Sequence, residues 1–378
     1  TYDAVLTLNG PLSVFDSLLG VAFERLGDRA ADGLKRVLSQ PRPERAVSGD
    51  VAPSSWVEML DAALELSVVG SFTRVGPALR RRFDAWHSLE GARLDGRVVV
   101  LSGATSGLGL EAARAFALMG ASVEIIARNS EKAEACCAEL RLQTVNEDIN
   151  FVVADLGDLE AVRRAATELL ERHATIDVLV HNAGALDHQH AYSPQGNEQT
   201  VASQVLGPFL LTSLLLPALR AATPSRILWV SSGGMYAEPL SVQQLEMGPE
   251  DYDGVTAYAR AKRAQVTLAE LMALRLTNEG VAVHAMHPGW ADTPGVARSL
   301  PKFRRALEPL LRTPAEGVDT LLWLAVDPTT PLQQTGRFWL DRRERPVHRL
   351  AKTRRADTLA ERQRLWEWAL AKSGLERF

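Results

Sequence analysis

Short hydrophobic runs alternate with amphipathic helical segments along the chain from Gly96 onward. The first run, residues 97–101, is apolar and rich in β-branched side chains, which is typical of a strand buried on both faces of a parallel sheet. A helical pattern follows over residues 111–119 and stops at Gly120. We count seven such strands. Strands that alternate with helices predict an α/β fold, in which helices cover both faces of a parallel sheet.

The first ninety or so residues follow a different pattern and predict a separate extension. Residues 2–8 alternate like a strand, residues 12–38 predict a long amphipathic helix, and residues 41–55 have the composition of a linker. This strand and helix resemble the end of a helix-grip lipid-binding domain. A single strand cannot bury its own edges, so the segment would be unstable or would pack on other parts of the protein. We therefore divide the chain into four parts: 1–45, 46–92 with its amphipathic helical segment, the βαβ domain 93–340, and 341–378.

Residues 56–86 predict one or two helices. Their last part, residues 79–86, combines three arginines with Leu79, Phe83 and Trp86. A basic helix with aromatic side chains can lie on a membrane surface, which would make the protein a peripheral membrane protein. The same apolar side chains can instead pack on the rest of the protein, and the sequence leaves both interpretations open.

The C-terminal segment, residues 341–378, is charged and contains a predicted helix near residues 356–372. Trp366 and Trp368 lie on this helix. Large aromatic side chains on a charged helix indicate docking, either on the core of the same chain or on a second subunit.

The composition is that of an ordinary globular protein, with 378 residues, 46% hydrophobic residues and a formal net charge of −4. The near-neutral charge leaves no basic footprint for nucleic acid, so no nucleic-acid partner is expected. We expect neither a signal peptide nor an apolar span of 18 residues, and hence a cytoplasmic location.

The cysteines and histidines give no sign of a disulfide or a metal site. Cys136 and Cys137 are the only cysteines, and neighbouring residues rarely form a disulfide. We expect both to pack on a helix in a reducing compartment. His188 and His190 are close in sequence, but no carboxylate or cysteine set joins them, so no metal is predicted.

A glycine-rich turn connects the first predicted strand to its helix. Gly103 allows the tight turn, Gly107 lets the backbone approach a pyrophosphate, and Gly109 permits close packing of helix and strand. The free N–H groups at the helix N-terminus and the helix dipole favour phosphate binding. The setting between strand and helix predicts a dinucleotide site, where the alternative is a simple tight turn. The non-glycine residues expected to line this site are Thr105, Ser106 and Leu108.

Tyr258 and Lys262 are four residues apart, which places both side chains on one face of a helix. A nearby ammonium favours the phenolate, so we expect the pKa of Tyr258 to fall from about 10 toward working pH. A tyrosine tuned in this way can transfer a proton to or from a substrate oxygen. The pair Ser231-Ser232 lies upstream. Because tyrosine and lysine meet at this spacing by chance on many helices, the pair needs support from other motifs.

Ordered motifs after the glycine turn supply that support, and together they resemble the short-chain dehydrogenase/reductase superfamily. The glycine spacing is Gly-x-x-x-Gly-x-Gly, as in that superfamily. The further motifs are, in order, Asp155 after residues 151–154, Asn182-Ala183-Gly184 after residues 177–180, Val230-Ser231-Ser232, Tyr258 with Lys262, and His287-Pro288-Gly289-Trp290-Ala291-Asp292-Thr293. Residues 230–235, 286–296 and 336–342 are more similar still to an orphan subgroup, dehydrogenase/reductase family member 12 and its bacterial relatives. That resemblance covers roughly residues 65–345 and implies no particular substrate.

The resemblance implies a Rossmann-type, doubly wound sheet of about seven strands in the order 3-2-1-4-5-6-7, with a helical N-terminal extension. The cofactor would span the switch point between the first and fourth strands. Tyr258 would be the general acid/base, and Lys262 would lower its pKa and bind the nicotinamide ribose. Ser232 would hold the substrate oxygen, whereas alternation along the strand points Ser231 the other way. The resemblance also implies a homo-oligomer built on helices 198–220 and 256–278, although the apolar faces of these helices also suit the core of the chain itself.

The same resemblance implies cofactor contacts at other strand ends. Asp155 would contact the adenine, and the Thr293 hydroxyl would bind the nicotinamide carboxamide. Each motif also has a structural alternative: Asp155 could cap the helix that starts near Asp158, Ser231-Ser232 could form only a turn, and Pro288-Gly289 could only end a strand. The other residues implied in cofactor binding are Leu156, Asn182, Ala183, Gly184, Pro288 and Gly289.

Two positions depart from the superfamily pattern. Gln204 stands where an asparagine usually helps to hold a water that relays protons from the lysine. Glutamine keeps the amide but adds a methylene, and a shift of about one ångström can cost much of the catalytic rate. His181 stands where an asparagine usually precedes Asn182, and its ring can still make one hydrogen bond.

The end of the second strand predicts which nicotinamide cofactor is bound. An NAD site needs a carboxylate here to accept from the ribose 2′-hydroxyl, but Ala127 occupies that place. Arg128 follows, and its guanidinium can pair with a 2′-phosphate. We therefore expect NADP, with NAD as the less favoured alternative. The other interpretation of Arg128 is a surface residue paired with Glu131.

Two apolar segments border the expected substrate cleft. Residues 233–255, which include Met235, Tyr236 and Tyr252, are expected to form one wall, and residues 294–313 a mobile lid. Their apolar character favours a lipophilic carbonyl or alcohol as substrate. The sequence thus predicts an NADP-dependent oxidoreductase, while a related epimerase or dehydratase is disfavoured by the short chain and the Pro288-Gly289 pattern. The alternative from another class is a cofactor-binding sensor or scaffold with little turnover, which Gln204 and the terminal segments motivate.

Overall fold

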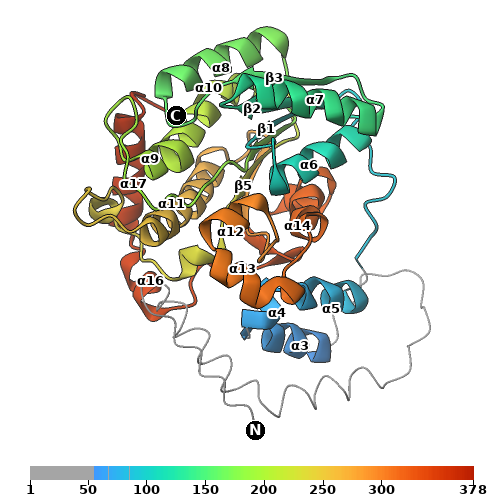
Figure 1. Ribbon diagram of the computed structural model, residues 1–378, viewed down its shortest axis with the longest axis vertical. Coiled ribbons are helices and arrows are strands. Elements are labelled where there is room, and N and C mark those ends of the chain that lie inside the picture. Colours follow the sequence, from blue (N-terminus) through green and yellow to red (C-terminus); the bar gives the residue numbers. More distant parts are fainter. Residues whose placement is uncertain (1–54, 67, 85) are drawn as a thin grey trace. The chain divides into compact units, whose positions relative to one another are not determined.

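The computed structural model describes residues 55–66, 68–84 and 86–378 (Figure 1). The predicted strand 2–8, the predicted helix 12–38 and the linker up to residue 54 lie outside the described residues. The chain divides into two compact units, Thr1–His87 and Ser88–Phe378, and each is described here by itself.

An eight-stranded sheet forms the centre of the second unit, with the strand order β3-β2-β1-β4-β5-β6-β7-β8. The predicted order of the first seven strands is confirmed, and all of these pair in parallel. An eighth strand, which the sequence did not predict, joins β7 in antiparallel fashion. The strands are β1 Val98–Ser102, β2 Ser122–Ala127, β3 Ile149–Val153, β4 Val178–His181, β5 Ser225–Val230, β6 Val281–Met286, β7 Arg337–Leu340 and β8 Arg343–Glu344.

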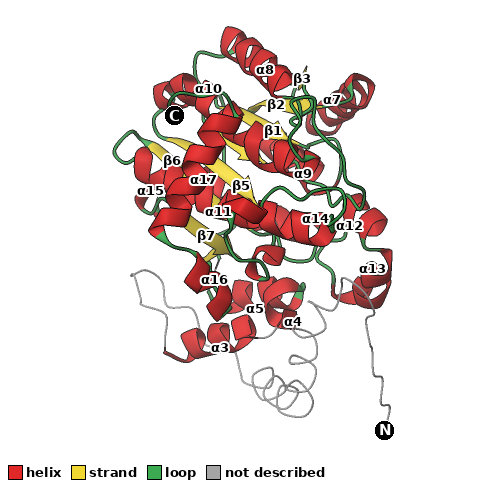
Figure 2. Cartoon of the chain, turned by 90° about the vertical axis from the view of Figure 1, so that its left-hand side faces the viewer, coloured by secondary structure: helices red, strands yellow, loops and turns green. Residues whose placement is uncertain are grey.

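Helices flank the sheet on both sides, as expected for a doubly wound fold (Figure 2). Capping side chains stabilise the N-termini of several helices. Asn129 accepts a hydrogen bond from Lys132 N, and Asp158 accepts one from Glu160 N. The longer helices are α6 Gly107–Leu118, α7 Ser130–Thr144, α8 Leu159–Arg172, α10 Gly207–Ala221, α11 Gly254–Arg275, α14 Pro314–Val326 and α17 Leu359–Lys372. The shorter helices are α9 Gln199–Val201, the π-helix η1 Ala202–Leu206, the 3₁₀ helices η2 Gly233–Tyr236, η3 Val242–Gln244 and η4 Glu308–Leu310, and α12 Pro294–Ser299, α13 Pro301–Leu307, α15 Thr330–Gln333 and α16 Ala351–Ala356.

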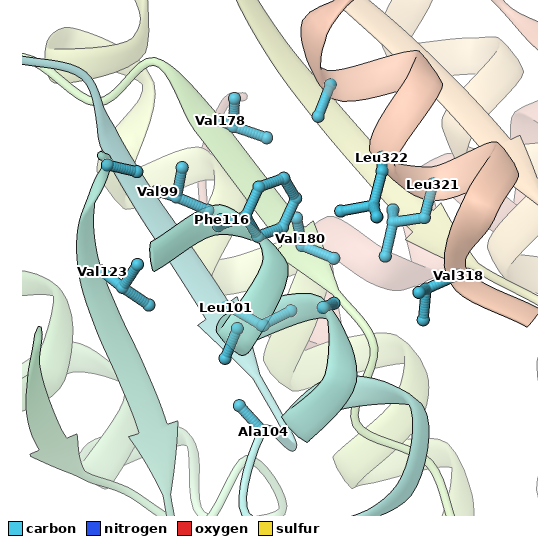
Figure 3. Packing of buried hydrophobic residues seen from close by; sticks show 14 of the residues in the cluster. Val99, Leu101, Ala104, Phe116, Val123, Val178, Val180, Val318, Leu321 and Leu322 are labelled. Atoms are coloured by element: carbon cyan, nitrogen blue, oxygen red, sulfur yellow. The ribbon is translucent and has the colours of Figure 1, made fainter. Parts of the chain in front are cut away.

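A hydrophobic cluster lies between one face of the sheet and the helices α6, α7 and α14. Figure 3 shows its part between the strands, α6 and α14. Val99 and Leu101 of β1 and Phe116 of α6 are fully buried in it, and Leu321 of α14 packs beside them. Cys136 also lies here, and both cysteines of α7 are free and buried, as predicted. This packing fixes the start of α6 against the end of β1, where the glycine turn lies.

One helical stretch corrects the expectation that the chain holds no apolar span of 18 residues. Residues Gln199–Ala221 have the length and mean hydropathy of a membrane span, the one such helix in the described part of the chain. However, 78% of this window is buried inside the protein, where α10 packs against α8 and the sheet. Its apolar character is therefore accounted for by burial in the core.

The C-terminal segment packs on the same chain. The Trp366 ring is buried and contacts Phe209 of α10 edge-on at 5.2 Å, while the Arg275 guanidinium lies 3.6 Å from its centroid. Ion pairs add to this contact, since Arg362 bonds Glu270 of α11 at 2.8 Å. Of the two docking modes left open by the sequence, Trp366 adopts the one within its own chain.

In the first unit, three short helices are described: α3 Ser55–Leu66, α4 Val68–Phe72 and α5 Val75–Phe83. Arg80 of α5 is buried, and its guanidinium bonds Asp61 at 2.7 Å and Glu65 at 3.4 Å. The basic cluster at residues 80–82 is therefore divided, because Arg80 points into its own unit while the two arginines after it are exposed.

Candidate active site

In the glycine turn between β1 and α6, neighbouring atoms lie so close to the backbone that side chains at Gly103 and Gly109 would not fit. Gly103 has φ +69°, and a Cβ there would lie 2.7 Å from the backbone of Ala183. At Gly109 a Cβ would lie 2.2 Å from the carbonyl oxygen of Gly103. Gly107 has φ +58° and begins α6, which starts four residues earlier than the sequence pattern predicted. The turn thus presents backbone N–H groups at a helix start, which fits a pyrophosphate.

Asn182 and Ser102 brace this turn from the neighbouring strand end. The Asn182 amide donates to the carbonyl oxygens of Ser102 at 3.1 Å and Gly103 at 3.0 Å. The Ser102 hydroxyl in turn accepts from the backbone N–H groups of Asn182 and Ala183, both at 3.1 Å. Ser102 was not singled out in the sequence. Its signal was its place as the last residue of a buried strand, directly before the first glycine.

Ser232, Tyr258 and Lys262 come together where β5 and α11 meet. Tyr258 lies in the second turn of α11, after Asp253 has capped the helix, and Ser232 directly follows β5. The Lys262 ammonium is 5.4 Å from the centroid of the Tyr258 ring. It donates to the carbonyl oxygen of Val230 at 3.0 Å and is buried. The structure therefore unites three of the four predicted catalytic side chains at one strand end.

Burial corrects the expected direction of the Tyr258 pKa. Removal from water raises the pKa of Tyr258, and a hydrogen bond with Ser232 lowers it only in part. Burial also lowers the pKa of Lys262 to about 7. The prediction of a lowered phenol pKa is thus wrong for this site, because loss of solvent raises the pKa more than the hydrogen bond with Ser232 lowers it. The phenol is protonated at neutral pH.

Ser231 points away from this site, as strand alternation predicted. Its hydroxyl is buried and donates to the carbonyl oxygen of Lys262 at 3.1 Å, so it joins β5 to α11. The hydroxyl of Ser232 faces the other way and accepts from Gly234 N at 3.2 Å. Ser232 also caps the short helix η2, so the turn that was the structural alternative is present beside the contact with Tyr258.

Gln204, the fourth predicted catalytic residue, lies in the π-helix η1. Single turns of π-helix are frequent at functional sites. Its amide donates to the carbonyl oxygen of Ala185 at 2.6 Å, while its side-chain oxygen is buried without a hydrogen-bond partner among the described residues. A Cβ at Gly184 would lie 3.1 Å from this oxygen and 3.0 Å from the Lys262 ammonium. The Gln204 side-chain oxygen, which can accept, and the Lys262 ammonium, which can donate, therefore both lie next to Gly184. These polar surroundings fit a sugar hydroxyl or a water.

Gln265 is a second residue that the sequence analysis missed. Its amide donates to the main-chain carbonyl oxygen of Gln204 at 2.6 Å, which holds the π-helix against α11. The signal available in the sequence was a glutamine three residues after Lys262, on the helix face that also carries Tyr258.

Residues 288–293 follow β6 and reach the glycine turn from its other side. Gly289 has φ +74°, and a Cβ at Gly107 would lie 3.3 Å from the Thr293 side chain. The Thr293 hydroxyl accepts from Val296 N at 3.2 Å and thereby caps α12. Pro288 and Gly289 are half-buried. Three strand ends, those of β1, β4 and β6, thus meet at the glycine turn.

Arg128 and Asp155 lie at the ends of β2 and β3. Arg128 is exposed and has no hydrogen bond or ion pair with the described residues, so the expected alternative of a pair with Glu131 is not observed. Asp155 is exposed and its carboxylate accepts from Gly157 N at 2.8 Å. Asp158, not Asp155, caps α8. The neighbouring Leu156 is buried.

The prediction that residues 233–255 form a wall of the substrate cleft is partly wrong. Met235 and Tyr236 are buried, and Tyr236 packs edge-on against His287 and Phe338. Both side chains therefore lie in the protein interior, where the Arg349 guanidinium of the C-terminal segment lies 4.4 Å from the centroid of the Tyr236 ring. Tyr252 is half-buried, and its hydroxyl bonds Thr200 at 3.0 Å. No group of three or more His, Cys, Asp or Glu that could hold a metal occurs within the described part of the chain.

Known proteins match this chain across the same region. Residues 97–302 match the short chain dehydrogenase family. The cattle (Bos taurus) protein dehydrogenase/reductase SDR family member 12 is 35% identical over 277 residues, which is 73% of this chain and 86% of that protein. The chain belongs to the short-chain dehydrogenase/reductase family. The resemblance to family member 12 that the motifs suggested is thereby confirmed.

This short-chain dehydrogenase/reductase is also similar to a second curated protein and to a solved structure. Human (Homo sapiens) retinol dehydrogenase 13 is 32% identical over 230 residues, covering 61% of this chain and 70% of that protein. The solved Pseudomonas aeruginosa RhlG/NADP active-site complex is 26% identical, with a TM-score of 0.54, and the match covers 65% of this chain and 94% of the other. Family membership makes the protein an oxidoreductase of the class that uses NAD or NADP.

Proposed function

We propose that the protein is an NADP-dependent oxidoreductase that interconverts a hydroxyl and a carbonyl group on a lipophilic small molecule. The observation that carries this proposal is the meeting of Ser232, Tyr258 and Lys262 at the end of β5, beside the glycine turn. A hydroxyl, a protonated phenol and a buried ammonium are the groups that a carbonyl reduction needs from the protein.

The residues divide the work as follows. Ser232 orients the substrate oxygen, and Tyr258 donates a proton to it in the direction of carbonyl reduction. The raised pKa of Tyr258 keeps its proton in place at neutral pH. Lys262, whose pKa is lowered to about 7, holds the nicotinamide ribose and can pass a proton onward. The bound cofactor supplies or accepts the hydride. Gly103, Gly107 and Gly109 cradle its pyrophosphate.

The preference for NADP rests on Arg128 and on the absence of a carboxylate at Ala127. An exposed guanidinium with no ion-pair partner among the described residues can bond a 2′-phosphate with two parallel N–H donors. The solved RhlG complex contains NADP, in agreement with this choice. Asp155, Leu156, Asn182, Ala183 and Gly184 would serve the adenosine half. Pro288, Gly289 and Thr293 would serve the nicotinamide half.

The lipophilic substrate is supported by apolar side chains near the lid. Trp290 and Phe303 pack edge-on at 5.0 Å, and Leu300 and Leu307 are half-buried on the same segment. Relatives named retinol dehydrogenases act on a lipophilic alcohol by their names. We propose a substrate of this class, such as a retinoid, steroid or lipid aldehyde.

Stopped-flow oxidation of NADPH tests the proposal with a panel of retinoid, steroid and long-chain aldehydes. The expected result is rapid NADPH oxidation with at least one of them, and none with a short polar aldehyde of equal reactivity. Preference for the polar aldehyde would contradict the lipophilic substrate.

A cofactor-binding module with little turnover is the second candidate, and Gln204 favours it. The glutamine amide is held by Ala185, and its oxygen lacks a described partner, so the usual asparagine arrangement is altered. In the same stopped-flow experiment, tight NADPH binding without oxidation by any carbonyl would favour the module.

Peripheral membrane contact through residues 56–86 is also a proposal, and now rests on Arg81 and Arg82. Flotation with anionic vesicles tests it. The wild type should float, and the variant R81E/R82E should not. Equal flotation of both would remove this surface as the contact.

A further inference from the structure

The segment between β6 and α14 is closed at its base by Arg312. The Arg312 N–H donates to the carbonyl oxygen of Trp290 at 2.8 Å, and its own carbonyl oxygen accepts from Asp292 N at 2.8 Å. Ala291 and Arg312 form a parallel bridge. Residues 293–311, called the lid segment from here on, therefore leave and return at one point. Residues 288–293, the nicotinamide loop, form the outgoing arm of that closure.

The side chain of Arg312 fixes this closure to the sheet. It is 1% exposed, and its guanidinium bonds both carboxylate oxygens of Asp341, at 2.6 Å and 3.1 Å. Asp341 directly follows β7 and is equally buried. The guanidinium also passes beneath the nicotinamide loop, since a Cβ at Gly289 would lie 2.3 Å from Arg312 Nε. A glycine is thus needed at position 289 because a larger residue would collide with the Arg312 side chain.

Ser299 of the lid segment contacts the loop after β4. The Ser299 hydroxyl donates to the carbonyl oxygen of Leu186 at 3.0 Å, and the His188 ring bonds the Ser299 carbonyl oxygen at 3.0 Å. Arg304 adds a two-bond pair with Asp292, at 2.6 Å and 2.9 Å. The lid segment therefore connects the nicotinamide loop to residues 186–188, close behind Gly184.

We propose that Arg312 and Asp341 are positioning residues, which hold the nicotinamide loop and the base of the lid segment in the cofactor-binding arrangement. This inference rests on the proposed function, in which residues 288–293 serve the nicotinamide half. A buried ion pair is a poor source of net stability, because desolvation of both charges offsets their attraction. What the pair supplies is geometry: a planar fork with two fixed bonds holds a backbone in one place.

A neighbouring ion pair provides a matched control. Arg342 bonds Asp319 of α14 with two bonds, at 2.9 Å and 2.8 Å, and both side chains are largely buried. None of the contacts described for this pair involves residues 288–293. The double variants R312Q/D341N and R342Q/D319N each remove two opposite charges and leave the net charge unchanged.

The experiment measures three quantities for the wild type and both double variants. These are the free energy of unfolding in urea, amide hydrogen exchange over residues 288–300 without cofactor, and the NADPH dissociation constant by fluorescence titration. For R312Q/D341N we expect exchange over residues 288–300 to be roughly tenfold faster and the dissociation constant roughly tenfold higher. R342Q/D319N should lose comparable stability and keep both values near those of the wild type.

The outcomes separate the inference from the proposed function. Equal exchange and equal NADPH affinity in the two double variants would overturn the positioning role. If the wild type does not bind NADPH, the proposed function fails, while the exchange measurement still decides whether the pair holds the loop. If R312Q/D341N does not fold, R312K keeps the charge but loses the fork. It should then show the same faster exchange in a folded protein, and wild-type exchange would overturn the inference.

Discussion

The buried Lys262 ammonium lies beside the half-buried Tyr258 ring, and loss of solvent acts on their pKa values in opposite directions. It lowers the pKa of Lys262 to about 7 and raises the pKa of Tyr258, so both groups move toward their neutral forms. A protonated phenol beside a lysine that titrates near neutrality suits proton donation to a carbonyl oxygen. The spacing of the two residues could be predicted, but their burial could not, since it depends on β5 and Ser232.

Arg128 carries the choice of cofactor at the residue scale. The variant R128A should raise the NADPH dissociation constant by about tenfold to a hundredfold, because it removes charge-assisted bonds to the 2′-phosphate. NADH affinity should change little. Fluorescence titration with both cofactors measures this, with K132A, an exposed cation on the next helix, as the control. Tighter binding of NADH than NADPH by the wild type would contradict the assignment.

At the scale of elements, the strands followed from the sequence because apolar β-branched runs are local signals, whereas their order was implied by the resemblance to the superfamily. The motifs at strand ends followed as well, since parallel strands bring their carboxyl ends to one edge. Gln265, Arg312 and the π-helix around Gln204 did not follow, because each depends on contacts between segments distant in the sequence. Such contacts leave no periodic trace.

The packing of α17 against α10 and α11 gives a prediction of its own. Trp366 is buried against Phe209 and Arg275, whereas Trp368 on the same helix is half-buried. The variant W366A should lower the free energy of unfolding by about 3–5 kcal/mol. W368A, as the control, should cost clearly less. Urea unfolding measures both, and equal losses would show that α17 does not dock through Trp366.

At the scale of the whole molecule, the C-terminal segment is part of the folded domain. Arg362 bonds Asp357 and Glu270, and its charge holds the pKa of Asp357 low although burial alone would raise it. The homo-oligomer implied by the resemblance stays a prediction. Where Trp366 covers Phe209 and Arg275, helices α10 and α11 are not available to a second subunit unless α17 moves.

Two buried histidines predict how the whole fold responds to acid. Burial lowers the pKa of His181 to about 3 and that of His284 to about 4. Both are neutral when folded, with His284 accepting from Trp339 at 3.0 Å. Between these values and about 6.5 the unfolded chain binds more protons than the folded one, so stability falls as pH falls.

From pH 6.5 to pH 4.5 each histidine should cost about 2 kcal/mol of unfolding free energy. Urea unfolding across this range measures the slope. The variants H181Q and H284Q should each show a shallower slope than the wild type, whatever their stability at neutral pH. Three parallel slopes would contradict the role of these side chains.

The most direct test of the central claim compares Y258F with Y252F in single-turnover oxidation of bound NADPH by a lipophilic aldehyde. Both variants remove one hydroxyl, but Tyr252 bonds Thr200 and the Asp187 carbonyl, whereas Tyr258 bonds Ser232. The account predicts that Y258F slows the reaction roughly 10²–10⁴-fold with NADPH affinity unchanged, while Y252F reacts nearly as fast as the wild type. Wild-type rates in Y258F would contradict the assignment of Tyr258 as the proton donor.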